Sequence, residues 1–241
     1  MSRLIPLSRR STAQSLSKES NKLGLNNVYQ PADSTPVIAD FVFVHGLGGG
    51  SSTSWCIKGR PESFWPKEWL PRDPDFGGIR IYSFGYNASW GTRSTSTLDI
   101  HAFGQSLVEE LLSDPNIRSS ATPIVLIGHS MGGLVMKKAC ILSRTNPDSA
   151  HLASRFHSFY FLGTPHRGAG LAKVLDNLLR ISGSGRKSFV AGLGAQSEMI
   201  RLLNDDFRVN YSGIRLHTFY ESQPMSHVGL VVERESAILG P

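Results

Sequence analysis

A Gly-x-Ser-x-Gly segment between two apolar stretches constrains the fold of this chain more than any other feature. The segment, residues 128–132, follows an apolar run at residues 123–127 that is typical of a buried strand, and a helix-forming run at residues 133–139 comes next. This pattern predicts a strand, a sharp turn and a helix, with a strained backbone at Ser130 and flanking glycines that avoid Cβ collisions. The Ser130 hydroxyl is expected to stand exposed above the sheet, at a helix N-terminus that favours negative charge. We interpret Ser130 as an acyl-accepting nucleophile; the alternative is a tight turn with an incidental serine.

A glycine-rich loop at residues 45–50 follows a second short apolar stretch, residues 40–44. Glycines let a loop approach closely and point its amides inward, where they can stabilise the oxyanion formed from an ester carbonyl. We expect the donors to be the backbone N–H groups of Leu47 and of Met131, the residue after the nucleophile. A phosphate cradle is the alternative, but the chain has neither a P-loop nor a dinucleotide-binding glycine pattern. His45 is interpreted as structural, because the general base of this architecture comes late in the chain.

Strands and helices alternate along the sequence, which predicts an α/β fold with a mostly parallel sheet covered on both faces. Apolar residues at positions 100, 103, 107 and 111 recur at helical spacing, and Thr97 is the expected N-cap of that helix. The aromatic-rich stretch from Trp55 to Trp69 is expected to pack over the sheet rather than to form a ligand cage. The expected strands are residues 41–44, 79–84, 123–127, 156–162, 214–220 and 228–232, and the expected helices lie around residues 100–111, 133–139, 171–179 and 199–207.

Several short motifs are distributed along the chain from about residue 24 to the last residue. They are Phe43-Val44-His45-Gly46-Leu47-Gly48-Gly49, Phe64-Trp65-Pro66 with Trp69-Leu70-Pro71, residues 128–135, Phe161-Leu162-Gly163-Thr164-Pro165-His166-Arg167-Gly168, Phe219-Tyr220-Glu221, and residues 231–232 with 236–237. On these motifs the chain resembles the lipase-like α/β-hydrolases of the serine esterase family. That family includes GPI inositol-deacylases, mitochondria-associated serine-active-site proteins and, as the most similar branch, the N-terminal domains of fungal NACHT-type receptors.

The resemblance implies an α/β-hydrolase domain over residues 24–241, with a mostly parallel sheet flanked by helices. This domain is expected to lack the last helix of the family. It implies an acyl-ester or lipid substrate, with peripheral contact at a membrane, and no cofactor. Insertions after the strand at residues 156–162 often form a lid in such hydrolases. The helix at residues 171–179 could cover an acyl cleft in this way, or it could be an ordinary crossover helix packed on the sheet. His166 and Arg167 are expected to brace loops rather than to act in chemistry.

The catalytic acid and base of this architecture follow the serine in the order acid, then histidine. Glu221 ends an apolar strand and is the expected acid, placed to orient an imidazole and to stabilise its protonated form. Family members carry their histidine after the segment that matches residues 236–237, and the sequence ends at Pro241 without one. His227 is the single histidine after Glu221, but it precedes the last expected strand and so comes from the wrong loop. The domain is therefore expected to be C-terminally truncated relative to the family.

Composition limits the other classes of function. Hydrophobic residues make up 40% of the 241 residues, and no apolar run approaches the roughly 18 residues of a membrane span. Two cysteines cannot form a disulfide framework, and Cys140 is expected to be a buried thiol on the core side of its helix. The chain has no CxxC or HExxH motif, so a metal site has no sequence support. The net charge of +6 is modest, and the basic residues are scattered, without the stripe of basic and aromatic residues that nucleic-acid binding would use.

The first 23 residues are basic, rich in serine and poor in acids. We interpret them as a disordered tail of a cytoplasmic protein; the alternative is a mitochondrial presequence, or a peripheral position at mitochondrial or ER membranes. A secretory signal is not expected, because no apolar stretch follows the positive residues.

The sequence supports two alternative functions. One is a serine esterase acting through an acyl-enzyme on Ser130, and the other is a catalytically impaired signalling or interaction domain without its base histidine. The intact serine turn favours the first, and the missing late histidine favours the second.

Overall fold

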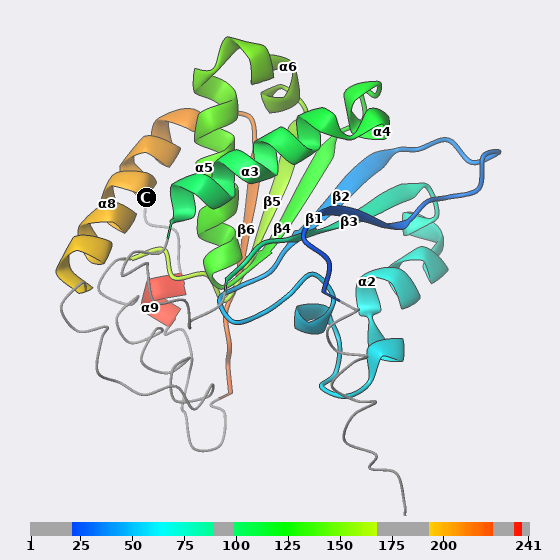
Figure 1. Cartoon of the computed structure of the whole chain (residues 1–241), viewed down its shortest axis with the longest axis horizontal. Coiled ribbons are helices and arrows are strands. Elements are labelled where there is room, and N and C mark those ends of the chain that lie inside the picture. The colour runs from blue at the N-terminus through cyan, green and yellow to red at the C-terminus, as the bar shows by residue number, and fades with distance from the viewer. Residues whose placement is uncertain (1–20, 89–98, 168–192, 224–233, 238–241) are drawn as a thin grey trace, which may run out of the picture.

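The computed structural model describes residues 21–88, 99–167, 193–223 and 234–237. Within these residues, strands form one sheet in the order β1-β3-β2-β4-β5-β6 (Figure 1). Only β1 runs antiparallel to its neighbour, β3, and the other described pairs are parallel, which confirms the mostly parallel sheet. The strands are β1 (Gly24–Tyr29), β2 (Ala39–Val44), β3 (Ile79–Gly85), β4 (Ile124–His129), β5 (Phe156–Leu162) and β6 (Arg215–Phe219).

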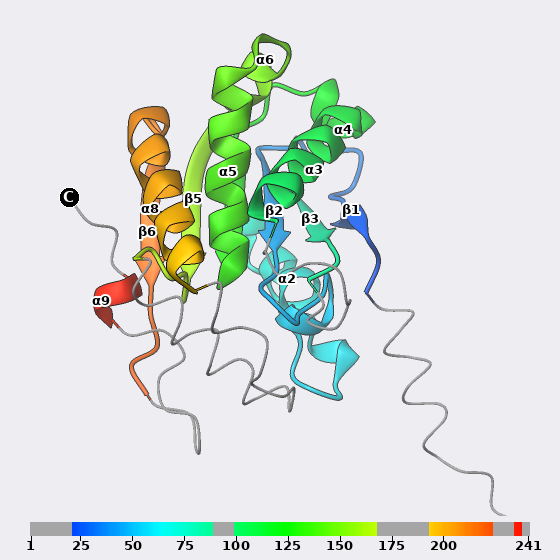
Figure 2. The ribbon, with the colours of Figure 1, turned by 60° about the vertical axis from the view of Figure 1, so that its left-hand side comes forward.

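Long helices cover one face of this sheet, and α5 lies between α3 and α8 (Figures 1 and 2). They are α3 (Ile100–Ser113), α5 (Met131–Thr145) and α8 (Leu193–Asn210). The short helices are α2 (Trp65–Glu68), α4 (Pro115–Arg118), α6 (Ala150–Ala153) and α9 (Arg234–Ala237). Single 3₁₀ turns occur at Thr53–Trp55, Pro61–Ser63, Leu70–Arg72, Pro74–Phe76 and Pro147–Ser149. Because α5 packs against helices on both sides, most of its side chains are buried, including that of Cys140, as predicted.

Side chains along the central strands alternate between two apolar cores. In β2, Val42 belongs to the core beneath the long helices, whereas Phe43 belongs to the core on the opposite face. There Phe43 packs edge-on against Trp55 and Trp65, with ring centroids 5.1 and 5.2 Å apart. The aromatic stretch after β2 therefore packs over the sheet, as the sequence predicts, although Trp69 at its end is exposed. Both faces of the sheet are thus covered.

Two local features differ from the sequence prediction. The N-cap of α3 is Asp99, whose carboxylate accepts a hydrogen bond from the N–H of Ala102 at 2.8 Å, so the expected cap Thr97 was wrong. Aspartate is as good a cap as threonine, and it stands directly before the first helical residue. Strand β1 was not predicted, because its sequence is short and polar. In the structure most of its residues are only half-buried. It is held by pairing with β3 and by Glu110, which accepts from the N–H of Leu25 at 3.0 Å.

A buried ion-pair cluster ties together the amino ends of three strands. Asp40 in β2 accepts hydrogen bonds from Arg80 of β3, at 2.7 and 3.1 Å, and from Arg155, directly before β5, at 3.0 Å. The Asp40 side chain is fully buried and both arginine side chains are nearly so. A buried carboxylate needs such partners, because an unpaired charge there would lack compensation for its lost hydration.

Some sequence predictions lie outside the described residues. These are the first 20 residues of the predicted tail at residues 1–23, the apolar helix at residues 171–179, the strand at residues 228–232, and His227. In the part of the chain that is described, we find no helix with both the length and the apolar composition that crossing a bilayer requires.

Candidate active site

Ser130 lies at the junction of β4 and α5, in the strained turn expected from the sequence. Its backbone has φ 53° and ψ −122°, and among the described residues no other non-glycine residue has a positive φ. Such a conformation costs about 1–3 kcal/mol for a residue with a Cβ atom. The N–H of Ser130 donates to the carbonyl of Leu162 at 2.8 Å, which fixes the turn against the end of β5.

The loop after β2 presses directly on this turn. A Cβ atom added at Gly46 would lie 2.9 Å from the Cβ of Ser130, and one added at Gly132 would collide with the carbonyl oxygen of Val44. Contacts this close are possible only without side chains at those two positions. The glycines of the two motifs thus bring the loop and the serine turn together, as the sequence predicts.

The serine hydroxyl differs from the prediction in one respect. Ser130 was expected to be exposed, but it is only 3% exposed, and its Oγ has no hydrogen-bond partner within the described structure. The expectation was wrong because it considered only the local turn. Gly46 lies against the serine, and a pattern within residues 128–132 cannot show such a long-range contact.

Both expected oxyanion donors lie beside the serine. Met131 is the first residue of α5, where a backbone N–H has no intrahelical acceptor, and Leu47 follows Gly46 in the adjoining loop. Neither N–H donates a hydrogen bond to any other described residue. Since both residues are buried, these amides are available to an oxygen atom that enters the site.

His45 is fully buried and engaged on both ring nitrogens. Its Nδ1 lies 2.8 Å from the carbonyl oxygen of Gly46, and its Nε2 accepts from the N–H of Tyr86 at 3.2 Å. Burial lowers the pKa of His45, although these backbone contacts oppose the shift. A ring that is neutral and hydrogen-bonded at both nitrogens has no free site for a substrate proton, which supports its structural interpretation.

Glu221 lies just beyond β6, on the same carboxyl edge of the sheet as Ser130. The N–H of Gly163, after β5, donates to the carbonyl of Phe219 at 2.8 Å, so the ends of β5 and β6 are held together there. Surrounding protein atoms lower the pKa of His129, and the charge of Glu221 opposes that shift. Glu221 is therefore near the residue that precedes Ser130.

A buried polar cluster beside the site was missed by the sequence analysis. Lys137 of α5 donates from Nζ to Oδ1 of Asn204 in α8 at 2.6 Å, and the Asn204 amide donates to the backbone oxygen of His166. The Lys137 ammonium also lies 5.5 and 5.3 Å from the ring centroids of Phe161 and Phe207. One signal was available, since Lys137 falls on the apolar face of an otherwise buried helix. The cluster holds the loop after β5, which agrees with the expected bracing role of His166.

The His166 ring cannot serve as an efficient base. Burial, together with the charge of Lys137, lowers the pKa of His166 to about 2. Neither ring nitrogen has a hydrogen-bond partner in the described structure. Arg167 is exposed. Within the described ranges, no group of three or more His, Cys, Asp or Glu side chains could hold a metal ion.

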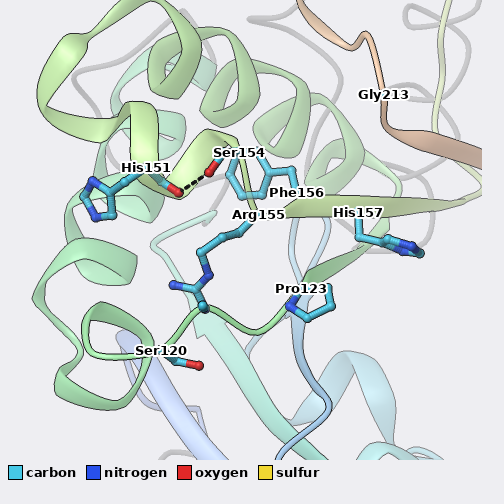
Figure 3. Close-up of a pocket in the computed structure, with 9 residues that line it drawn as sticks. Ser120, Pro123, His151, Ser154, Arg155, Phe156, His157 and Gly213 are labelled. Atoms are coloured by element: carbon cyan, nitrogen blue, oxygen red, sulfur yellow. Dashed lines mark hydrogen bonds between the residues drawn. The ribbon is translucent and has the colours of Figure 1, made fainter.

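A separate cavity of about 590 Å³ lies at the opposite, amino edge of the sheet (Figure 3). It is lined by Ser120, Ala121, Pro123, His151, Ser154, Arg155, Phe156, His157 and Gly213. The guanidinium of Arg155 is already hydrogen-bonded within the protein, because it donates to the Asp40 carboxylate and to the backbone oxygens of Thr122 and Ile117. The Arg155 guanidinium is therefore engaged within the protein, and the cavity is remote from the serine turn.

Comparisons with known proteins agree with the fold. Residues 41–228 match the family described as "Alpha/beta hydrolase family". Protein SERAC1 of mouse is 30% identical over 233 residues, which cover 86% of this chain and 34% of that protein. Protein SERAC1 of human is 28% identical over 231 residues, with the same coverage. The chain thus spans about a third of the length of these curated relatives.

Solved structures with a similar arrangement are more distant. A lipase-esterase related protein from Clostridium acetobutylicum is 14% identical, with a TM-score of 0.41, over 86% of this chain and 92% of that one. An esterase from Pyrococcus furiosus is 13% identical, with a TM-score of 0.42, over 89% of this chain and 74% of that one. At these identities and TM-scores, the solved structures say nothing about this chain that its own sheet order does not already show. With the family match covering most of its length, the chain belongs to the alpha/beta hydrolase family.

Proposed function

We propose that this chain is a serine hydrolase that cleaves carboxylic esters through an acyl-enzyme on Ser130. The observation that carries the proposal is the strained turn, which sets Ser130 beside two backbone N–H groups with no acceptor among the described residues. Two buried backbone amides without a described acceptor, next to a serine, match the requirement of an oxyanion, whose charge develops only during reaction.

In the proposed reaction, Oγ of Ser130 bonds to the ester carbonyl carbon while its proton passes to a histidine base. The carbonyl oxygen becomes an oxyanion held by the N–H groups of Leu47 and Met131. Collapse of this intermediate expels the alcohol, which takes the proton from the histidine and leaves an acyl-enzyme. Water then releases the acid by the same steps. Glu221 would orient the histidine, for which His227 is the candidate within the sequence.

A second candidate is a hydrolase-like signalling or interaction domain with impaired catalysis. It is favoured by the Ser130 hydroxyl, which has no hydrogen-bond partner in the described structure and hence no base in contact with it. Without a base a serine hydroxyl is a poor nucleophile, although an oxyanion hole and binding alone leave a residual rate.

Finer aspects of the proposal rest on the motif resemblance. We propose a lipid or other acyl-ester substrate, with peripheral contact at a membrane, and kinship to GPI inositol-deacylases and to the N-terminal domains of fungal NACHT-type receptors. A cytoplasmic location is proposed, with a mitochondrial one as the alternative. Fusing residues 1–23 to a fluorescent reporter distinguishes these two, since a presequence would direct the reporter to mitochondria.

Covalent labelling with a fluorophosphonate tests the proposed nucleophile. We expect the purified chain to be labelled and its Ser130→Ala variant to remain unlabelled. Ser143→Ala is the matched control, because Ser143 is also a buried α5 serine whose hydroxyl lacks a partner among the described residues. That variant should label like the parent chain. A folded parent chain that takes no label would contradict the hydrolase proposal and favour the impaired domain.

If labelling occurs, His227→Gln tests the base. Loss of labelling in that variant, with an unchanged thermal midpoint, would assign the base to His227. Full labelling would mean that another group removes the serine proton.

A further inference from the structure

Tyr86, directly after β3, holds His45 from several sides. Its backbone N–H donates to Nε2 of His45 at 3.2 Å, and its hydroxyl donates to the backbone oxygen of His45 at 2.6 Å. The two rings also stack, with centroids 4.2 Å apart and an interplanar angle of 11°. A second tie joins the same segments, since the N–H of Gly48 donates to the carbonyl of Ala88 at 3.1 Å. The loop after β2 is therefore clamped by the residues after β3.

These contacts determine where the His45 proton lies. Because Nε2 accepts from Tyr86, the proton of the neutral ring must be on Nδ1, which then donates to the carbonyl oxygen of Gly46 at 2.8 Å. The N–H of Gly49 donates to the same oxygen at 3.1 Å. The Gly46 carbonyl is thus fixed by two donors, one of which is positioned by Tyr86.

The Gly46 carbonyl and the Leu47 N–H belong to one peptide unit. The described residues contain no cis peptide bond, and in a trans peptide the C=O and N–H bonds point in opposite directions. Fixing the carbonyl direction therefore fixes the direction of the Leu47 amide. The same glycine lies against Ser130, so a rotation of this peptide would change what the amide presents to the nucleophile.

We propose that Tyr86 is a positioning residue that presets the Leu47 N–H as an oxyanion donor, acting through His45. This inference rests on the proposed hydrolase function, because an oxyanion hole is meaningful only for a nucleophilic serine. Burial raises the pKa of Tyr86 well above its usual value, so its hydroxyl remains a donor. Preorganised donors stabilise a transition state because they need no reorientation when charge develops.

The test compares Tyr86→Phe with Tyr82→Phe. Both tyrosines are buried, Tyr82 within β3 and Tyr86 just after it, and each hydroxyl donates one hydrogen bond. The Tyr82 hydroxyl donates to Asp114 at the start of α4 rather than to the loop after β2. Fluorophosphonate labelling kinetics separate the apparent affinity from the rate constant for bond formation at Ser130. Losing one oxyanion donor slows such chemistry roughly 100- to 1,000-fold, so a misdirected donor should slow it about tenfold or more.

We expect Tyr86→Phe to lower the rate constant while apparent affinity changes less than about twofold, and Tyr82→Phe to leave both near parental values. Equal slowing in the two variants, or a loss confined to affinity, would overturn the inference. The ¹⁵N–¹H resonance of Leu47 gives a readout that needs no activity. If the parent chain takes no label, a Leu47 shift in Tyr86→Phe alone would uphold the positioning while the hydrolase proposal fails. An unchanged Leu47 resonance would reject the positioning as well.

Discussion

At the scale of single residues, His166 is a histidine whose pKa the fold shifts far from its ordinary value. Burial next to Lys137 lowers the pKa of His166 to about 2, far below its ordinary value of 6.5. The folded protein therefore keeps the ring neutral under conditions in which the unfolded chain takes up a proton. This difference makes the stability contribution of His166 complete above pH 6.5, and progressively lost as the pH falls from 6.5 towards 2.

We therefore predict that His166 makes the fold sensitive to mild acid. Between pH 7.5 and pH 5.0 the free energy of unfolding should fall by roughly 2 kcal/mol on account of this ring. His166→Gln removes the titration, so the same change in pH should cost that variant about 2 kcal/mol less. Urea unfolding at the two pH values measures the difference, and His151→Gln, at an exposed position, is the control. If His166→Gln and the parent chain lose equal stability in acid, the ring is not held neutral.

At the scale of elements, the site depends on how closely the start of α5 approaches the end of β2. Gly132 makes this approach possible, because the carbonyl oxygens of Val44 and His45 occupy the space of a side chain there. Main-chain atoms cannot move aside as the tip of a flexible side chain can. Relief would require α5 and β2 to separate, which would displace Met131 from the loop that carries Leu47.

Gly132→Ala should therefore destabilise the fold by about 2 kcal/mol or more and strongly reduce labelling of Ser130. Gly77→Ala is the matched control, since Gly77 has helical dihedral angles and a Cβ there would be 3.6 Å from its nearest neighbour. That change should alter the free energy of unfolding by less than about 1 kcal/mol. Chemical denaturation and fluorophosphonate labelling measure the two effects. Parental stability in Gly132→Ala would show that the elements can separate freely.

At the scale of the whole molecule, the proposed active site and the buried ion-pair cluster lie at opposite edges of the sheet. Ser130, Leu47 and Glu221 follow the carboxyl ends of strands, whereas Asp40 gathers two arginines at the amino ends. Asp40→Asn leaves both buried guanidinium groups without their anion. We expect this change to lower the free energy of unfolding by about 3–5 kcal/mol, as for other broken buried ion pairs.

Glu68→Gln provides the comparison for Asp40→Asn. It makes the same chemical change in an ion pair with Arg72 that is accessible to solvent, and it should cost no more than about 1 kcal/mol. Urea midpoints for the two variants test the contrast. Similar losses in both would mean that burial does not govern the strength of the Asp40 cluster.

Much of this architecture could be predicted from local sequence. The strand at Phe156–Leu162 and the serine turn were predicted because apolar runs and glycines act within a few residues. The polar strand β1 could not be, since its partner β3 lies far along the chain. The contact of Gly46 with Ser130 and the hydrogen bond of Lys137 to Asn204 likewise join residues that are far apart in the sequence. The roles of Ser130, Leu47, Met131 and Glu221 remain predictions that labelling and mutation can test.

The backbone of Ser130 also bears on the history of the chain. Glycine adopts a positive φ without the strain that a serine incurs, so any drift from serine to glycine at this position would relax the turn. A lineage released from selection for chemistry has nothing to oppose that drift. A serine in this strained turn is therefore a residue at which we expect selection to act on the hydroxyl.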